Sequence, residues 1–496
     1  MNSPQDTIAA IATPLGEGGL GVIRVSGMKA IEIVAVLFDS SKETDLRTVE
    51  SHTCHYGVIK EPSPYPLPKG RGPTTRSETG CRPSPFREKV AARPDEGPLP
   101  IDQAVVTVFR APHSYTGEDV VEISSHGSPF ILQKILKACL SQGARAAGPG
   151  EFTERAFLSG KMDLTQAEAV AELIRAKTDK TQTAALAQLE GRLADRVREL
   201  RDAIVPLLAH VEVGLDHSDE DHDFLERKRL ITRCGELQAS IAEILTSARL
   251  GKILRDGWRI ALVGRPNVGK SSLLNALLKE ERAIVTPIAG TTRDTLEEGV
   301  NWDGLPVVLT DTAGLREQTS DPIEQMGMAR TRRAVESSDL VIGLFDGSEP
   351  LSEEDKRIVS ECSSKSHIWV MNKTDLPHQW EPNALTALNG NTPTLRISAK
   401  TGEGLHALVE QVKQIALSEK SSSGEAQWLL NVRHQQALER AKTSLGEAAE
   451  AARRDAFEEC VAMELQSALQ ALGEIIGETA TEDLLDQIFS QFCIGK

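Results

Sequence analysis

The chain has 496 residues, enough for about three domains of ordinary size. Its 72 Asp and Glu residues outnumber its 56 Lys and Arg residues, and the formal net charge is −16. Proteins that bind nucleic acid through charge alone depend on clustered Lys and Arg, so this composition excludes that class but permits one local basic site. The content of 40% apolar and 26% charged residues is typical of a globular protein.

The seven cysteines are odd in number and show no CxxC spacing. This favours reduced thiols in the cytoplasm over a disulfide framework. The first residues lack the basic and apolar pattern of a secretory signal, and no run of about 18 apolar residues occurs. We therefore expect a cytoplasmic protein with no membrane as partner.

Residues 1–160 predict an α+β domain. Alternation of apolar and polar residues predicts strands at 22–25, 104–109 and 120–124. Residues 129–140 are expected to be helical. Residues 62–100 hold ten of the chain's 24 prolines with interleaved basic side chains. Such a segment buries too little apolar surface to fold, so we expect a disordered insertion, with a basic arm for nucleic acid as the alternative.

Residues 161–256 predict an all-α domain. Apolar residues recur at spacings near three and four from Leu186 to Val211, which indicates one stripe of a long helix that bends or ends near Pro206. Residues 217–223 are acidic and include two histidines. A loop between helices is the expected structure there, and a metal site is the alternative.

Residues 257–419 alternate short apolar runs with helical sequence, the pattern of a parallel α/β domain. The strands are expected at 259–263, 307–310, 340–345, 368–371 and 395–397. Residues 420–496 return to helix rich in Ala, Leu and Glu, without a core of their own. We expect them to complete the helical domain of residues 161–256, which makes the α/β domain an insertion.

Residues 264–271 read GRPNVGKS, which matches the P-loop pattern GxxxxGK[ST] between a strand and a helix. Backbone N–H groups of this loop would cradle phosphates, Lys270 would reach the β and γ oxygens, and Ser271 would bind Mg²⁺. Residues 311–314 (DTAG) follow a strand. The Asp311 carboxylate would help to organise Mg²⁺, and the Gly314 N–H would contact the γ-phosphate. Thr291 or Thr292 is expected to close on Mg²⁺ as part of a switch loop.

Residues 372–375 read NKTD. Asp375 can accept hydrogen bonds from N1–H and the 2-amino group of guanine, and adenine lacks this donor pair. Residues 398–400 (SAK) would support the base. The expected GTP contacts are Asn267, Val268, Gly269, Lys270, Ser271, Ser272, Thr286, Pro287, Ile288, Ala289, Gly290, Thr291, Thr292, Asp311, Thr312, Ala313, Gly314, Asn372, Lys373, Thr374, Asp375, Ser398, Ala399 and Lys400.

The attacking water needs an unusual partner, because position 315 is Leu where Ras-like proteins use Gln. Polar candidates downstream are Arg316, Glu317 and Glu324, which together with Lys270 form the candidate catalytic set in this domain. Asn267 lies where a carboxamide oxygen could hold a monovalent cation, although the residues alone favour a loop-stabilising role.

Through these motifs the chain resembles the MnmE (TrmE) family of tRNA modification GTPases, within the TrmE-Era-EngA-YihA-Septin-like P-loop GTPases. The resemblance spans nearly everything except residues 62–100. Its further markers are DTI at 6–8, ATP at 12–14, RVSG at 24–27, SYTGED at 114–119, HG at 126–127, GEFTERA at 150–156, LTQAEA at 164–169 and CIGK at 493–496.

The resemblance implies an N-terminal folate-binding and dimerisation domain at 1–160, a helical domain in two parts at 161–256 and 420–496, and an inserted GTPase domain at 257–419. It implies a homodimer that joins the flavoprotein MnmG in a heterotetramer. That complex would add a (carboxymethyl)aminomethyl group to the 5-position of the wobble uridine of certain tRNAs. A 5-formyl- or methylene-tetrahydrofolate would be the one-carbon cofactor.

The resemblance also implies residue roles. Potassium would be held by Asn267, Thr286, Ile288 and Thr291, which reverses the residue-based interpretation of Asn267, and Mg²⁺ by Ser271 and Thr292. Potassium-stimulated hydrolysis would use Glu324 to position water, although the gap from DTAG is one residue longer than the family pattern. The folate contacts would be Arg24, Glu122, Lys161 and Lys496.

Cys493 matches the family's C-terminal cysteine and is a candidate catalytic residue near the folate site, with a buried structural thiol as the alternative. A ribosome-assembly GTPase is the alternative function, because such proteins share the nucleotide motifs. A lipid anchor on Cys493 is a third interpretation, and Gly495 and Lys496 fit its motif poorly.

Overall fold

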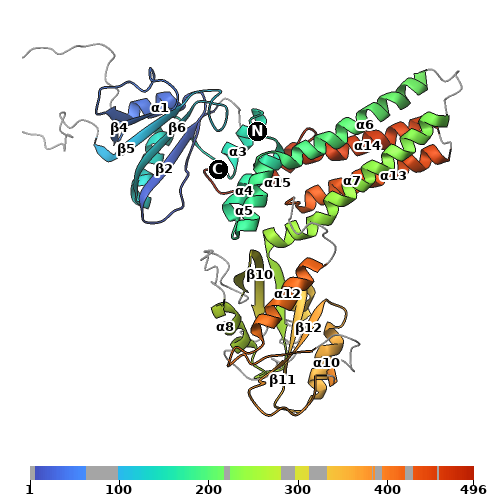
Figure 1. The fold of residues 1–496 in the computed structure, drawn as a ribbon. Helices are drawn as coiled ribbons and strands as arrows, with labels where there is room; N and C mark the ends of the chain where they lie inside the picture. The colour runs from blue at the N-terminus through green and yellow to red at the C-terminus, as the bar shows by residue number, and fades with distance from the viewer. Residues whose placement is uncertain are drawn as a thin grey trace, which may run out of the picture. The chain divides into compact units, whose positions relative to one another are not determined.

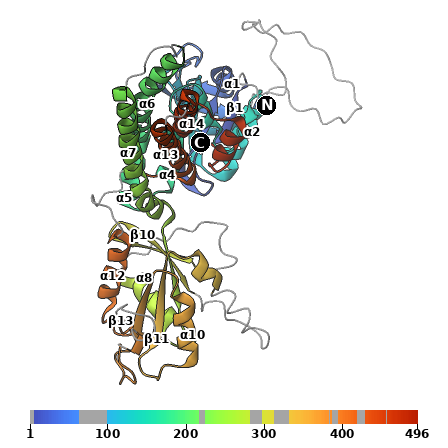
Figure 2. The same ribbon diagram turned by 90° about the vertical axis from the view of Figure 1, so that its right-hand side faces the viewer.

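The computed structural model describes residues 6–62, 99–216, 224–280, 297–311, 332–382, 384–385, 394–418, 428–454 and 457–496. It divides into two compact units, residues 1–167 with 480–496, and residues 168–479 (Figures 1 and 2). Within the described part, no helix combines the length and apolarity needed to cross a bilayer. Residues 63–98 of the predicted insertion and the acidic segment 217–223 lie outside the described residues.

The first unit is built on a sheet with the strand order β3-β4-β5-β6-β2-β1-β7. Its strands are β1 (Ile8–Ile11), β2 (Gly18–Ser26), β3 (Phe38–Ser40), β4 (Thr53–Lys60), β5 (Pro100–Phe109), β6 (Val120–Gly127) and β7 (Arg145–Ala146). Neighbouring strands are antiparallel except β1 and β7. The predicted strands and the α+β class of this region are confirmed.

Two helices cover one face of this sheet. Helix α2 (Pro129–Ser141) was expected, whereas α1 (Ala30–Leu37) was not, because its continuous apolar run has no clear helical period. Both helices share a core with inward side chains of the strands, such as Ile23, Val106 and Ile123. Side chains of the opposite register therefore lie on the other face of the sheet.

The last segment of the chain, residues 480–496, belongs to this first compact unit. Helix α15 (Glu482–Phe489) contacts α3 (Glu151–Leu158). The approach is close, since a Cβ at Gly150 would lie 2.8 Å from the backbone oxygen of Phe489, and Gly150 has φ of 66°. Helical pattern alone cannot show which partner an amphipathic helix packs against.

The helical domain of the second unit is assembled from two separate stretches of sequence, as expected. Its helices are α4 (Leu164–Arg175, which begins in the first unit), α5 (Asp179–Leu189), α6 (Arg192–Asp216), α7 (Phe224–Asp256), α13 (Val432–Arg453) and α14 (Glu458–Ile476). One core joins α6 and α7 to α13 and α14. Figure 1 shows α6 alongside α14 and α7 alongside α13.

The predicted single stripe along Leu186–Val211 is wrong at its start, and at Pro206 the structure excludes only the alternative of a helix end. Leu186 belongs to α5, because the chain breaks at Gly191, whose φ is 91°. Helix α6 then continues through Pro206 to Asp216 rather than ending there. Packing of Leu200 and Ile204 into the bundle core favours helix on both sides of the proline.

The α/β domain forms a sheet with the order β13-β12-β11-β8-β10-β9. Its elements are β8 (Trp258–Val263), α8 (Lys270–Glu280), β9 (Glu297–Trp302), β10 (Leu305–Asp311), β11 (Leu340–Asp346), α10 (Glu353–Cys362), β12 (His367–Asn372), β13 (Thr394–Arg396) and α12 (Leu405–Ser418). The five predicted strands are parallel, and the unpredicted edge strand β9 is antiparallel to β10. One apolar core contains α8 and α12, and a second core on the opposite register contains α10.

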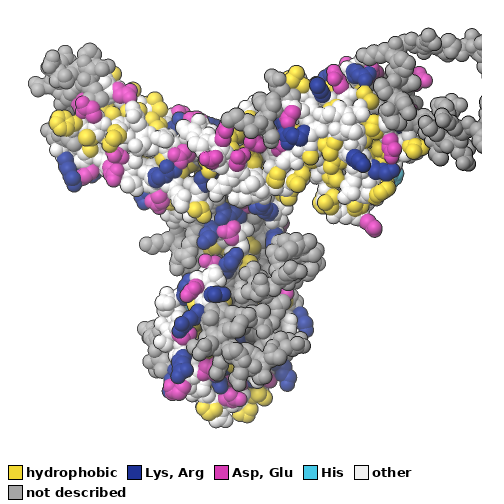
Figure 3. Space-filling model, turned by 180° about the vertical axis from the view of Figure 1, so that it is seen from behind, with side chains coloured by type: hydrophobic (Ala, Val, Ile, Leu, Met, Phe, Trp, Pro, Cys, Tyr) yellow, Lys and Arg dark blue, Asp and Glu magenta, His cyan; other side chains and the backbone are white. Residues whose placement is uncertain are grey.

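The acidic chain carries no large one-sign surface on the side seen in Figure 3. Lys and Arg side chains there are interspersed with Asp and Glu side chains over the described residues. The six cysteines in the described part form no disulfide. The described residues hold no group of three His, Cys, Asp or Glu side chains suited to a metal ion.

A buried ion pair joins α4 to the start of α13, beside the end of α14. Arg433 donates to Glu168 Oε2 at 2.9 Å and to the backbone oxygen of Ile475 at 3.1 Å, near the end of α14. His434, fully buried, contacts Glu168 Oε2 at 2.7 Å. Burial raises the pKa of Glu168, but His434 and Arg433 lower it by more, to about 2. Burial also lowers the pKa of His434, which leaves Arg433 as the lasting cationic partner.

We predict that Glu168→Gln lowers the free energy of unfolding at pH 7 by about 3 kcal/mol, because Arg433 loses its buried partner. A carboxyl with a depressed folded pKa stabilises the fold above its ordinary value of 4.5, and this stabilisation is lost as pH falls toward 2. The variant should therefore lose less stability than the wild type on acidification. Urea unfolding followed by circular dichroism at pH 7 and pH 3 measures both effects.

The matched control is Glu450→Gln, which removes an exposed partner of Arg453 and Arg454 from α13. Its unfolding should match that of the wild type, because exposed ion pairs contribute little. Equal unfolding curves for Glu168→Gln and the wild type would contradict the role of the buried pair.

Candidate functional site

Polar residues that were singled out from the sequence gather at one edge of the α/β sheet. Strands β8, β10, β11, β12 and β13 run parallel, so their carboxyl ends share that edge. The P-loop follows β8, Asp311 ends β10, Asn372 ends β12, and Ser398 follows β13. Parallel α/β folds bind ligands at this edge, since the loops and helix N-termini there converge.

The P-loop has the backbone of a phosphate-binding loop. Asn267 has φ of 66° and Gly269 has φ of 102°, which turns the chain tightly into α8. Lys270 is 6% exposed, and its Nζ donates to the backbone oxygens of Gly264 and Arg265, each at 2.7 Å. The lysine therefore lies along the loop, where it is able to meet an anion at the helix N-terminus.

Asn372 joins the P-loop to the two other loops of this edge. Its Nδ2 donates to the backbone oxygen of Val268 at 2.8 Å, and its Oδ1 accepts from the backbone N–H of Ala399 at 2.9 Å. A Cβ at Gly269 would lie 2.3 Å from Asn372 Nδ2, so the loop comes this close only with glycine there. One buried amide therefore sets the spacing between the P-loop and the SAK loop.

Asp375 is held in place by its neighbour in the SAK loop. Ser398 Oγ donates to Asp375 Oδ1 at 2.7 Å, and Ser398 Oγ also accepts from the backbone N–H of Thr401 at 3.2 Å. The described contacts leave the second carboxylate oxygen, Oδ2, available to a base. Lys373, with φ of 65°, contacts Asp346 at the end of β11. Burial raises the pKa of Asp346, and Lys373 and Ser348 lower it by more, so the net shift is downward.

Several predicted nucleotide, metal and catalytic residues lie outside the described residues. They are Thr286, Pro287, Ile288, Ala289, Gly290, Thr291, Thr292, Thr312, Ala313, Gly314, Arg316 and Glu324.

A second cluster of predicted residues lies in the N-terminal unit, on the sheet face opposite α1 and α2. Arg24 on β2 stands in register with Glu122 on β6. Its Nε and Nη2 donate to Glu122 Oε1 at 2.9 Å and 2.8 Å, and 15% and 28% of the two side chains are exposed. The pair is therefore accessible, and the described contacts leave Glu122 Oε2 available to a ligand.

One aromatic ring from a loop and one from helix α3 flank the Arg24 guanidinium. Its Cζ lies 5.3 Å from the centre of the Tyr115 ring and 5.7 Å from that of Phe152. The Tyr115 hydroxyl is 2.9 Å from Thr153 Oγ1, which ties the two ring-bearing segments together. Neither ring was predicted from the sequence, although Tyr115 lies in the SYTGED marker and Phe152 in the GEFTERA marker.

The end of the sequence reaches the same face. The backbone oxygen of Gly495 accepts from Arg24 Nη1 at 3.5 Å, and Gly495, with φ of 95°, packs against Ile11 and Ala12. Burial lowers the pKa of Lys496, Arg24 lowers it further, and Glu122 and Cys493 offset only part of the shift. Lys496 therefore lies near enough to Arg24 and Glu122 for their charges to affect its pKa.

Lys161 and Cys493 have different surroundings from those expected. Lys161 Nζ donates to the backbone oxygen of Pro112 at 2.9 Å, and no described contact joins it to Arg24 or Glu122. Cys493 is exposed, so the alternative of a buried structural thiol is wrong. Its backbone oxygen accepts from the N–H of Gly150 at 3.3 Å, which fixes the main chain and leaves the thiol accessible.

We predict that Gly269→Ala weakens GTP binding by about tenfold or more, because the added Cβ combines a positive φ with a clash against Asn372. Gly299→Ala is the matched control, since a Cβ there meets nothing within 4 Å. Titration with a fluorescent GTP analogue measures both affinities. Equal dissociation constants for the two variants would show that the close approach of the P-loop to Asn372 is dispensable.

Comparison with known proteins covers both units. The family model described as "GTP-binding protein TrmE N-terminus" matches residues 7–161, and the one described as "MnmE helical domain" matches residues 164–493. The tRNA modification GTPase MnmE of Levilactobacillus brevis is 42% identical over 99% of this chain and 98% of its own length. That of Symbiobacterium thermophilum is 42% identical over 99% and 100%.

Solved structures also match about a third of the chain. One is that of Aquifex aeolicus Era bound to GDP and aluminium fluoride, at 26% identity over 37% of this chain and 65% of that one, with a TM-score of 0.25. The full-length relatives and the two family models carry the assignment. The chain belongs to the MnmE (TrmE) family of tRNA modification GTPases.

Proposed function

We propose that this chain couples potassium-stimulated GTP hydrolysis to folate-dependent modification of the wobble uridine in tRNA. It would work with the flavoprotein MnmG to add a (carboxymethyl)aminomethyl group at the 5-position. The best support is that one chain carries two candidate sites. One is the edge of the α/β sheet with the motifs for a guanine nucleotide, and the other is the accessible Arg24–Glu122 pair beside the last residues. A protein that only switches on GTP has no need of the second site.

Guanine selectivity would come from Asp375. The bond from Ser398 orients the carboxylate, and the contact of Asn372 with Val268 keeps the base-reading and phosphate-binding loops at a fixed separation. A carboxylate facing adenine would lose the two donors that guanine provides. Lys270 and Ser271 at the start of α8 would meet the phosphates and Mg²⁺.

Potassium would bind at the phosphates with Asn267 as one ligand. The Asn267 side chain is exposed on the P-loop, and its positive φ turns this residue out of the helical path. The cation would offset charge on the transferring phosphoryl group, the task of an arginine finger in related enzymes. Thr286, Ile288 and Thr291 would complete its shell, Thr292 would join Ser271 on Mg²⁺, and Glu324 would orient water.

GTP turnover should therefore be on the order of tenfold faster in potassium than in sodium at equal ionic strength. Asn267→Ala should remove most of this difference, because a methyl group cannot ligate a cation. Phosphate release measured in the two salts checks both statements. Equal turnover in the two salts for the wild type would remove potassium from the proposal and leave GTP hydrolysis in place.

A reduced folate would bind on the open face of the N-terminal sheet. Glu122 Oε2 could accept from the amino group of the pterin, and Arg24 and Lys496 could pair with folate carboxylates. Tyr115 and Phe152 add apolar surface beside Arg24. The bound folate would supply the one-carbon unit, and the exposed thiol of Cys493 would lie near it. Lys161 is the weakest member of this set, since its ammonium is engaged by Pro112.

The family membership also underlies the proposed partners. A homodimer through the N-terminal unit and a heterotetramer with MnmG would operate in the cytoplasm, where tRNA is the substrate. Contact with tRNA would be local, because basic and acidic side chains are interspersed on the described face of Figure 3. The alternative of a ribosome-assembly GTPase predicts a basic RNA-binding surface, which this described face does not present.

Nucleoside analysis by mass spectrometry tests the proposal in a strain that lacks the gene. The full chain should restore the wobble-uridine modification, and Arg24→Met should restore little of it, because the charge facing Glu122 is lost. Arg47→Met, which removes an exposed arginine of the same unit, is the matched control and should act like the wild type. A ribosomal-subunit defect with normal wobble uridine would favour the alternative function.

A further inference from the structure

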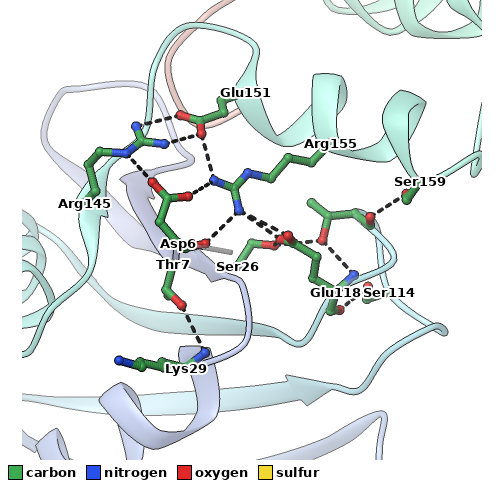
Figure 4. Close-up of polar contacts among 11 residues, drawn as sticks. Asp6, Thr7, Ser26, Lys29, Ser114, Glu118, Arg145, Glu151, Arg155 and Ser159 are labelled. Carbon is green, nitrogen blue, oxygen red and sulfur yellow. Dashed lines mark hydrogen bonds and ion pairs between the residues drawn. The ribbon is translucent and has the colours of Figure 1, made fainter. Parts of the chain in front are cut away.

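Three family markers with no assigned role, DTI, SYTGED and GEFTERA, meet at one largely buried arginine (Figure 4). Arg155 on α3 is 10% exposed, and its guanidinium contacts carboxylates from three separate segments. Nη2 donates to Glu151 Oε1 at 2.9 Å, and Nη1 donates to Glu118 Oε1 at 3.1 Å. Nη1 also donates to the backbone oxygen of Asp6 at 2.9 Å, and Nη2 pairs with the Asp6 carboxylate. One side chain thus joins the segment just before β1, the SYTGED loop and helix α3.

These contacts continue to the residues around Arg24. Glu118 Oε2 accepts from Ser26 Oγ at 2.7 Å, and Ser26 lies two positions after Arg24 on β2. Ser26 Oγ is also 2.7 Å from Thr116 Oγ1, next to Tyr115. At the other side, Glu151 immediately precedes Phe152. The two rings that flank Arg24 are therefore each one residue away from a member of this network.

A second arginine takes part in the network but does not reach the SYTGED loop. Arg145 donates to Asp6 Oδ2 at 2.7 Å and to Glu151 Oε2 at 3.0 Å. Its described contacts do not include Glu118. Without Arg155, Asp6 and Glu151 would keep Arg145, whereas Glu118 would keep only the neutral Ser26 hydroxyl. The charge left unpaired would lie in the SYTGED loop that also carries Tyr115, and an unpaired partly buried carboxylate is costly.

We propose that Arg155 is a positioning residue for the Arg24 site, acting through Glu118 to hold the Tyr115 and Phe152 rings against the Arg24 guanidinium. The proposal rests on the folate-binding function proposed above. Arg155 would not touch the ligand. Arg155 would keep Arg24 and its aromatic neighbours in one arrangement before binding. This lowers the conformational entropy that these side chains lose when the ligand binds.

The full-length protein tests this with 5-formyltetrahydrofolate as the probe, in calorimetric titrations of Arg155→Met, Arg155→Lys, Arg145→Met and Arg24→Met. Arg155→Met should raise the dissociation constant about tenfold or more, and Arg145→Met by less than about threefold. Arg155→Lys should fall between them, because an ammonium keeps the charge but cannot span three carboxylates. In the modification assay, Arg155→Met should raise KM for the folate donor more than it lowers kcat.

The outcomes distinguish positioning by Arg155 from folate binding itself. If Arg24→Met loses the probe while Arg155→Met binds it like the wild type, positioning by Arg155 is wrong and folate binding stands. If all four variants bind like the wild type, the folate function itself is wrong. Equal losses for Arg145→Met and Arg155→Met would show that the network acts only through general stability and would overturn the role of Glu118.

Folding is checked for each variant by thermal melting and GTP turnover. If Arg155→Met does not fold, Glu118→Gln replaces it, because the amide keeps the hydrogen bond from Ser26 and removes the charge that Arg155 holds. That variant should also raise the dissociation constant of the probe, by about three- to tenfold. An unchanged dissociation constant for a folded Glu118→Gln would overturn the proposal.

Discussion

The shared core of the helical domain is the constraint on which the rest of the second unit depends. Helices α6 and α7 bury their apolar stripes only against α13 and α14, which lie beyond the whole α/β domain in sequence. The chain must therefore leave and re-enter the bundle at neighbouring points. The approach is close, since a Cβ at Gly251 would lie 2.4 Å from the backbone oxygen of Trp428. An α/β domain held by two adjacent connections can be inserted without breaking the core around it.

Parallel strands impose the second constraint, because their carboxyl ends place four loops at one edge. Asn372 uses both ends of its amide there, toward Val268 and toward Ala399, so that the phosphate loop and the base loop share one buried residue. Glycine at position 269 is the steric condition for this contact. Such rigid spacing suits recognition of one nucleotide, since phosphate and base must fit together.

In the N-terminal unit, charge pairing replaces a large apolar core on the face that carries Arg24. A small cluster that includes Ile8, Ala10 and Phe152 covers that face near β1. The carboxylates around Arg155 and Arg145 fix the surrounding segments, and the end of the chain closes over Pro149 and Gly150. Polar networks of this kind give a defined geometry when every member is paired. A ligand site can then remain open to solvent on a face that still has one conformation.

The sequence by itself determined the P-loop, the NKTD and SAK motifs, the parallel class of the inserted domain and the completion of the bundle by later helices. Each rests on local spacing or on an apolar stripe that needs a partner. Only the tertiary structure decided that α15 packs on α3, that β9 forms an antiparallel edge, and that Gly191 rather than Pro206 breaks the helix. It also decided which side chains meet Arg24, because Tyr115 and Phe152 arrive from segments far apart in sequence. Local pattern shows that a residue must be buried or paired, but its partner is chosen by packing between segments that the pattern does not connect.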